Sequence, residues 1–250
     1  MSKYSHDIIV PFEGSEQSKK EQVAGMFDQI AFRYDTLNRL LSGGIDIYWR
    51  RRAIKELQEL APKKVLDVAT GTADVALMTY KYLQPDQIIG IDISEGMLEL
   101  GREKVAKLLL NKHIELQKGD SEAINFPDNS FDAVTVAFGV RNFENLEKGL
   151  KEMYRVVKPG GKVVILEFSK PNKKWFSGIY NVYMKLIAPK AGAWLSKNKE
   201  AYSYLNNSVK AFPEGETFLH ILQHCGFTQT SLKRLSLGIC TIYCGNKRND

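Results

Sequence analysis

Apolar residues between positions 63 and 168 fall into short runs, and segments with helical periodicity separate them. The runs predict strands over Lys64–Val68, Gln87–Asp92, His113–Gln117, Phe131–Val136 and Lys162–Phe168. Helical segments follow the first, second and fourth runs, and Ser94 is placed to cap the second of these helices. Near-continuous apolar strands that alternate with helices predict a parallel sheet covered on both faces.

The C-terminal part has a different pattern. Thr217–Cys225 is expected to form a helix, and two β-rich segments, Thr228–Leu235 and Ile239–Cys244, follow it with a short join. Two strands with so short a connection pair antiparallel. Parallel strands followed by a helix and an antiparallel hairpin are typical of the α/β, class I S-adenosylmethionine-dependent methyltransferase fold, with a seven-stranded, mostly parallel sheet whose last strand is antiparallel.

This pattern predicts one methyltransferase domain over residues 1–250. Residues 1–60 would form an N-terminal helical cap and residues 63–168 the cofactor-binding core. Residues 170–212 would form a helical lid insertion, and residues 214–250 the final helix and β-hairpin.

Composition narrows the class of protein. Hydrophobic residues make up 44% of the chain and charged residues 26%, which is ordinary for a globular protein. The three cysteines lack the number for a disulfide framework and the paired spacing for a zinc site. No apolar run approaches the ~18 residues of a membrane-spanning helix, and residues 1–20 carry no signal core. We therefore expect a cytoplasmic protein, with peripheral attachment to the inner face of the cell membrane as an option.

Polar residues follow the first three predicted strands where those strands end. Asp67 and Gly71 lie at the end of the first strand, Asp92 ends the second, and Asp120 and Ser121 follow the third. In an open parallel sheet, ligands bind beyond the carboxyl ends of the strands. A single glycine and a nearby acid do not match the three-glycine nicotinamide fingerprint. Asp67 can instead pair with the cationic amino-acid end of S-adenosylmethionine, Asp92 can bind its ribose hydroxyls, and Asp120 with Ser121 can meet its adenine edge.

Longer stretches of the chain resemble the ubiquinone/menaquinone biosynthesis C-methyltransferase family. They are Met26–Asn38, Ser42–Gly44, Trp49–Arg51, Phe138–Asn142, Glu167–Pro171 and Tyr202–Pro213. The last three are far more specific than the cofactor loop, and the resemblance extends from about residue 20 over nearly the whole chain. It implies methylation of a ring carbon of demethylmenaquinol, a 2-polyprenyl-1,4-naphthoquinol, with Thr72, Asp92, Asp120 and Ser121 in contact with the cofactor.

Two positions depart from that family's usual pattern. Its cofactor loop usually reads GTGD, where this chain has Ala73 as the third letter, and some members carry serine where this chain has Ala137. We expect the Ala73 methyl to lie where the ligand comes close, and Ala137 to remove a side-chain hydrogen bond.

An aromatic carbon is a poor nucleophile until a neighbouring hydroxyl loses its proton, so the acceptor must be the reduced quinol. Arg141 and Asn142, just beyond the fourth strand, are the candidate catalytic residues because they can hydrogen-bond a developing phenolate. The alternative for Arg141 is a loop cation paired with Glu144. Tyr34, Asp35 and Tyr204 are candidate proton relays.

The histidines give no clear general base. His220 and His224 have the spacing of a metal pair but lack a third ligand, so we expect no metal. The base itself stays open.

The segment 170–199 is strongly basic and aromatic. It holds seven lysines and no acid, together with five aromatic residues, and residues 151–250 carry 16 basic against 6 acidic side chains. The segment predicts an amphipathic lid that touches an anionic membrane where a polyprenyl tail enters. The alternative is a lid packed on the domain with solvated lysines outside. Nucleic acid is disfavoured because no binding module accompanies the segment.

Other functions remain open at this level. They are methylation of another lipid-like or small aromatic acceptor, such as a ubiquinone-pathway benzoquinol, or a non-catalytic subunit that binds S-adenosylmethionine in a quinone-synthesis assembly. A nicotinamide oxidoreductase is disfavoured. The oligomeric state is also open, with a homodimer as one option.

Overall fold

The computed structural model describes residues 4–171 and 199–249, and within them lies a seven-stranded sheet with the order β3-β2-β1-β4-β5-β7-β6. The parallel strands are β1 (Lys64–Val68), β2 (Gln87–Asp92), β3 (Ile114–Lys118), β4 (Phe131–Ala137) and β5 (Val157–Phe168). The strands β6 (Thr228–Leu235) and β7 (Cys240–Asn246) pair antiparallel, and β7 inserts beside β5. The predicted fold class is confirmed.

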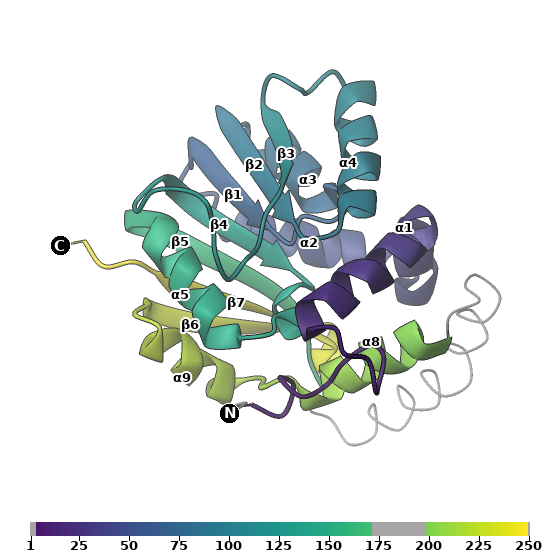
Figure 1. Ribbon diagram of the computed structural model, residues 1–250. Helices are drawn as coiled ribbons and strands as arrows, with labels where there is room; N and C mark the ends of the chain where they lie inside the picture. Colours follow the sequence, from purple (N-terminus) through teal and green to yellow (C-terminus); the bar gives the residue numbers. More distant parts are fainter. Residues whose placement is uncertain (1–3, 172–198, 250) are drawn as a thin grey trace.

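Helices cover both faces of this sheet (Figure 1). On one face pack α5 (Leu146–Val156) and α9 (Glu216–His224), which bury Leu150 and Phe218 against the sheet. On the other face pack α2 (Ile45–Lys55), α3 (Asp74–Leu83) and α4 (Glu95–Lys107). Strand β1 contributes to the hydrophobic core on each face of the sheet. Leu66 and Val68 pack on the face covered by α5 and α9, and Val65 packs on the face covered by α2, α3 and α4.

Two further helices lie near the end of the sheet toward which the parallel strands run (Figure 1). They are α1 (Lys19–Ser42) and α8 (Lys199–Ala211). Helix α1 starts in a capping box formed by Ser18 and Glu21. It ends at Gly43 and Gly44, whose positive φ values of 59° and 79° turn the chain sharply into α2.

One predicted strand start was wrong. The fifth strand was expected to begin at Lys162, but β5 already begins at Val157 and includes Pro159, Gly160 and Gly161. Val157 pairs with Phe131 and Lys162 with Ala133, so the extra residues form an irregularity in the ladder. Gly160, with φ 75°, accommodates it. Of the predicted lid, residues 172–198 lie outside the described residues.

Candidate cofactor and acceptor site

A cavity of ≈ 70 Å³ lies beyond the carboxyl ends of β1, β2 and β4, beneath α1. The strand ends and the loops after them supply most of its walls. The loop residues that line it include Ala69, Gly71, Asp92, Ile93, Gly119, Asp120, Ser121, Glu122, Phe138, Gly139, Asn142, Phe143 and Glu144. This is the edge of the sheet where ligands of open α/β folds bind.

The turn after β1 is tied to the end of β2. Gly71 adopts φ 54°, and the space around its Cα is open for 4 Å in the direction of a side chain. Its N–H donates to Asp92 Oδ2 at 2.8 Å, and the N–H of Ser94 donates to Asp92 Oδ1 at 2.9 Å. Burial raises the pKa of Asp92, and these backbone hydrogen bonds oppose that effect. Each carboxylate oxygen has two lone pairs, so each can accept one further hydrogen bond from a ligand hydroxyl.

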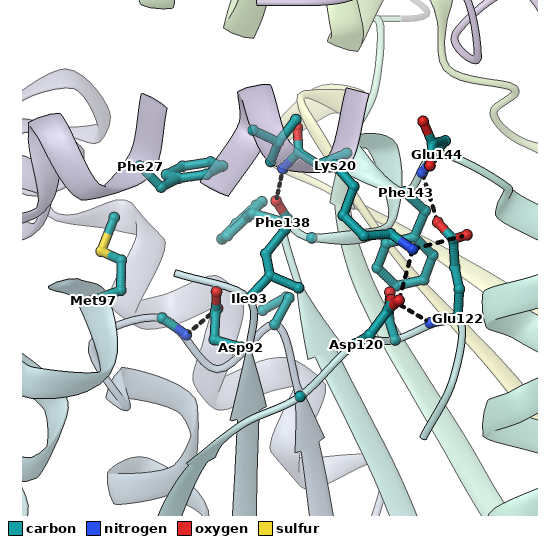
Figure 2. Close-up of a pocket in the computed structure, with 18 of the residues that line it drawn as sticks. Lys20, Phe27, Asp92, Ile93, Met97, Asp120, Glu122, Phe138, Phe143 and Glu144 are labelled. Atoms are coloured by element: carbon teal, nitrogen blue, oxygen red, sulfur yellow. Dashed lines mark hydrogen bonds and ion pairs between the residues drawn. The ribbon is translucent and has the colours of Figure 1, made fainter. Parts of the chain in front are cut away.

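The loop after β3 presents a second carboxylate (Figure 2). Asp120 Oδ1 accepts the N–H of Glu122 at 2.9 Å, and Asp120 Oδ2 accepts Lys20 Nζ at 2.6 Å. Glu122 in turn accepts the N–H groups of Glu144 and Asn145 at 2.8 and 3.0 Å. Burial alone lowers the pKa of Lys20, but the hydrogen bonds and charges of the two acids outweigh it and raise the pKa. The loops after β3 and β4 are thus joined to each other and to the start of α1.

Asp67 and Thr72 do not line the cavity. Asp67 is buried and accepts hydrogen bonds from Thr70 Oγ1 and Thr135 Oγ1, both at 2.6 Å. Burial raises its pKa to about 6, although these two hydrogen bonds favour the ionised form. Thr72 Oγ1 donates to Asp35 Oδ1 at 2.7 Å. Through these hydrogen bonds both residues stabilise the turn after β1 from the side away from the cavity.

Arg141 is held away from the cavity by an ion pair that the sequence did not suggest. Its Nη1 lies 2.7 Å from Glu167 Oε1, and the two side chains are 4% and 0% exposed. The proposed pairing with Glu144 is therefore wrong; Glu144 Oε1 instead accepts the N–H of Lys19 at 3.1 Å. Arg141 Nε is buried without a hydrogen-bond partner among the described residues. Arg141 is not among the residues that line the cavity.

Asn142 lines the cavity, and Tyr204 holds it. The Tyr204 hydroxyl donates to Asn142 Oδ1 at 3.1 Å from the buried side of α8. Burial raises the pKa of Tyr204, so the hydroxyl stays protonated and serves as a donor. Tyr204 thereby fixes which end of the Asn142 amide is presented to the cavity.

Four cavity residues lie on one stripe of α1, and of these the sequence pointed only to Tyr34, as a possible proton relay. They are Lys20, Val23, Phe27 and Tyr34, and Met97 of α4 joins them. The spacing of three, four and seven residues places the four on one helix face. The spacing of these residues can be read from the sequence, but the sequence does not show that this face of α1 lies over the ends of the strands.

Ion pairs hold the C-terminal half of α1 against its neighbouring helices. Asp35 Oδ2 lies 2.5 Å from Lys104 Nζ, and Asp74 Oδ1 lies 2.9 Å from the same atom. Arg39 pairs with Asp74 at 2.7 Å and also with Asp46. This network ties the C-terminal half of α1 to α2, α3 and α4.

The Ala73 methyl does not lie beside the cavity, contrary to what the sequence had led us to expect. Ala73 is fully buried in the core and is not among the cavity residues, so its methyl does not face a ligand there. Its φ is 66°, in the left-handed region where glycine is at ease and alanine is strained. Ala137 does line the cavity, at the end of β4.

Comparison with known proteins agrees with this geometry. The model of the ubiE/COQ5 methyltransferase family matches residues 15–247. The chain belongs to the ubiE/COQ5 methyltransferase family. A Bacteroides fragilis protein named demethylmenaquinone methyltransferase is 48% identical over 244 residues, which cover 98% of this chain and 99% of that protein. A Geobacter sulfurreducens protein named ubiquinone/menaquinone biosynthesis C-methyltransferase UbiE is 47% identical over 230 residues, which cover 92% and 90%.

Solved structures share the fold of this ubiE/COQ5 family member at low identity. A SAM-dependent methyltransferase from Thermotoga maritima superposes with a TM-score of 0.63 at 17% identity and covers 90% of this chain and 99% of its own. Within the described residues, no helix is both long and apolar enough to cross a membrane. The same residues contain no group of three or more histidine, cysteine or acidic side chains arranged to hold a metal ion.

Proposed function

We propose that this protein transfers a methyl group from S-adenosyl-L-methionine to a ring carbon of demethylmenaquinol and so forms menaquinol. The observation that supports this most directly is a cavity with Asp92 and Asp120 at the ends of neighbouring strands, in a chain 48% identical to a named demethylmenaquinone methyltransferase. The bound cofactor supplies an electrophilic methyl group, so the protein's task is to align the acceptor and exclude water.

The residues present fit the adenosine part of that cofactor. Asp92 has spare acceptor capacity for two hydroxyls, and Asp120 can accept from an exocyclic amino group. Ile93, Met97 and Phe143 supply apolar walls between these carboxylates. Neither carboxylate would favour a pyrophosphate, which supports a methyl donor over a dinucleotide.

The acceptor side rests on Asn142 and Arg141. We propose that the Asn142 amide meets an acceptor oxygen at the cavity wall, with Tyr204 holding it in place. Arg141 does not line the cavity, and its ion pair with Glu167 supports the acceptor side by holding the segment that carries Asn142. None of the four histidines lines the cavity formed by the described residues, and Asp92, Asp120 and Tyr34 are the oxygen-bearing side chains there that we propose as candidate proton acceptors, directly or through water.

The second candidate acceptor is the benzoquinol of the ubiquinone pathway. It is favoured by the 47% identity to the Geobacter sulfurreducens protein, whose name includes both quinones. The deciding assay follows methyl transfer by mass spectrometry, with the purified protein given a reduced polyprenyl naphthoquinol, its oxidised quinone or the matching benzoquinol. The expected result is turnover of the naphthoquinol and none of the oxidised quinone. Turnover of neither quinol would overturn the proposal.

The acceptor residue is tested in the same assay. Asn142→Ala should lower kcat while leaving cofactor affinity nearly unchanged, because the amide acts on charge that develops during the reaction. The exposed Asn111→Ala is the matched control. If Asn142→Ala kept full turnover, the acceptor would have to bind elsewhere.

We also propose that the acceptor is taken from an anionic membrane through residues 170–199, most of which lie outside the described residues. Seven lysines without an acid in that stretch support the proposal. Liposome co-sedimentation should show salt-sensitive binding that charge reversal of Lys173, Lys174 and Lys185 weakens. Equal sedimentation of both proteins at low salt would leave the segment as a packing element only.

A further inference from the structure

Lys20 occupies the carboxylate that the adenine edge of the cofactor would use. Its Nζ lies 2.6 Å from Asp120 Oδ2 and 3.4 Å from Glu122 Oε2, and Figure 2 shows it reaching between the two acids. Asp120 Oδ1 already accepts the N–H of Glu122. Both oxygens of Asp120 therefore have a donor before any ligand arrives.

The lining of the cavity leads to the same residue. Lys20 is among the residues that line it, so its side chain borders the space that a nucleoside would enter. The C-terminal half of α1 is fixed by the Asp35, Lys104 and Asp74 network. Lys20, by contrast, is about a third exposed, and its long side chain can change rotamer at little cost.

We propose that Lys20 is an intramolecular placeholder for the cofactor's adenine: its ammonium group holds the Asp120 carboxylate in the free protein and moves to Glu122 when the adenine amino group binds Asp120. The inference rests on the proposed function, because it assumes an adenosyl ligand in this cavity. Ammonium and exocyclic amino groups are both N–H donors, and they compete for the position beside Asp120 Oδ2 that Lys20 Nζ occupies.

Glu122 is suited to receive the displaced lysine. Its Oε2 is already within 3.4 Å of Lys20 Nζ, and its Oε1 is fixed by the N–H groups of Glu144 and Asn145. The carboxylate is thus held in place whether or not Lys20 is bound to it. The exchange keeps the lysine's charge compensated and opens the adenine edge of the cavity.

The consequence is that Lys20 weakens cofactor binding. The free energy needed to break the partly exposed Lys20–Asp120 ion pair is subtracted from the binding free energy of the ligand. Lys20→Met removes this cost, so it should tighten binding of S-adenosyl-L-homocysteine about two- to fivefold. S-adenosyl-L-homocysteine is the suitable probe because it carries no net charge and does not react. Affinity of the unsubstituted protein should rise between about 50 mM and about 500 mM salt, because screening weakens the pair, whereas Lys20→Met should show no such rise.

The experiment is calorimetric titration of the full chain with three further arms. Lys107→Met, which removes an exposed lysine paired with Glu103 on α4, is the matched control and should bind as the unsubstituted protein does. In an Asp120→Asn background, Lys20→Met should change nothing further. S-inosyl-L-homocysteine, which lacks the amino donor, should gain no affinity from Lys20→Met.

The outcomes separate the two proposals. If the unsubstituted protein does not bind S-adenosyl-L-homocysteine, the proposed function itself is at fault. If it binds and Lys20→Met binds equally or more weakly, the placeholder role is overturned and Lys20 instead supports the ligand. Lys20→Gln, which keeps a neutral donor, should fall between the two, and thermal unfolding of each variant checks that α1 is intact.

Discussion

Replacing Arg141 by methionine tests what holds the loop between β4 and α5, residues 138–145, which carries Asn142 and is called the acceptor loop. Residue 141 lies in the short segment between β4 and α5 along the chain, and its ion pair with Glu167 of β5 is almost completely buried. Methionine keeps most of the volume and removes the charge. Glu167 then retains only the N–H of Phe168 at 2.8 Å and the N–H of residue 141 at 3.4 Å as hydrogen-bond donors among the described residues.

The expected cost follows from that burial. Breaking a buried ion pair on one side leaves an uncompensated charge and costs about 3–5 kcal/mol of unfolding free energy. The partner substitution Glu167→Gln needs no counterion, so the double variant Arg141→Met/Glu167→Gln should recover most of the loss. The matched control is Arg102→Met, which breaks the exposed pair with Glu95 and should cost at most about 1 kcal/mol.

The assay is urea unfolding followed by tryptophan fluorescence and circular dichroism, with equal m-values required for comparison. Burial raises the pKa of Glu167, and the charge of Arg141 opposes that effect. Removing Arg141 raises this pKa further. Because a folded pKa above the unfolded one favours folding at low pH, the penalty of Arg141→Met should shrink as the pH falls and grow as it rises.

A loss below about 1 kcal/mol for Arg141→Met, or no rescue in the double variant, would refute the role of the pair. A rescue of stability without a rescue of turnover would show that the charge of Arg141 contributes to turnover in addition to holding the fold. Recovery of both would show that the pair serves only to position Asn142.

Three further predictions concern the cofactor side. Asp92→Ala should weaken binding of S-adenosyl-L-homocysteine by about 1–3 kcal/mol, since a charged acceptor of two hydroxyls is lost, and unchanged affinity in calorimetry would sink its assignment. Ala73→Gly should raise the unfolding free energy by about 1 kcal/mol by relieving a positive φ, while affinity changes little; a destabilised variant would contradict the strain argument. Asp67, with its pKa raised to about 6, favours folding below about pH 4 and loses that advantage as the pH rises through about 6. Asp67→Asn should therefore be more stable than the unsubstituted protein at about pH 7, by up to about 3 kcal/mol, and equal pH profiles in urea unfolding would show that burial does not perturb this carboxyl.

The positions of the strands along the chain and their parallel or antiparallel type could be predicted from local pattern. Each central strand is a short run of apolar residues, and burial on both faces leaves no polar alternation to confuse it with a surface strand. The start of β5 could not be predicted, because Pro159 and Gly160 signal a turn locally and only pairing with β4 and β7 makes the segment a strand.

The sequence by itself determined the fold class and the placement of Gly71, Asp92, Asp120, Ser121 and Asn142 at one edge of the sheet, because parallel strands bring their carboxyl ends together. It could not decide which charged residues pair across that edge. Arg141 and Glu167 are 26 positions apart, and Lys20 and Asp120 are 100 apart, so neither pairing leaves a periodic signal. Only tertiary packing, which places α1 over the strand ends and Glu167 of β5 behind the acceptor loop, chose these partners.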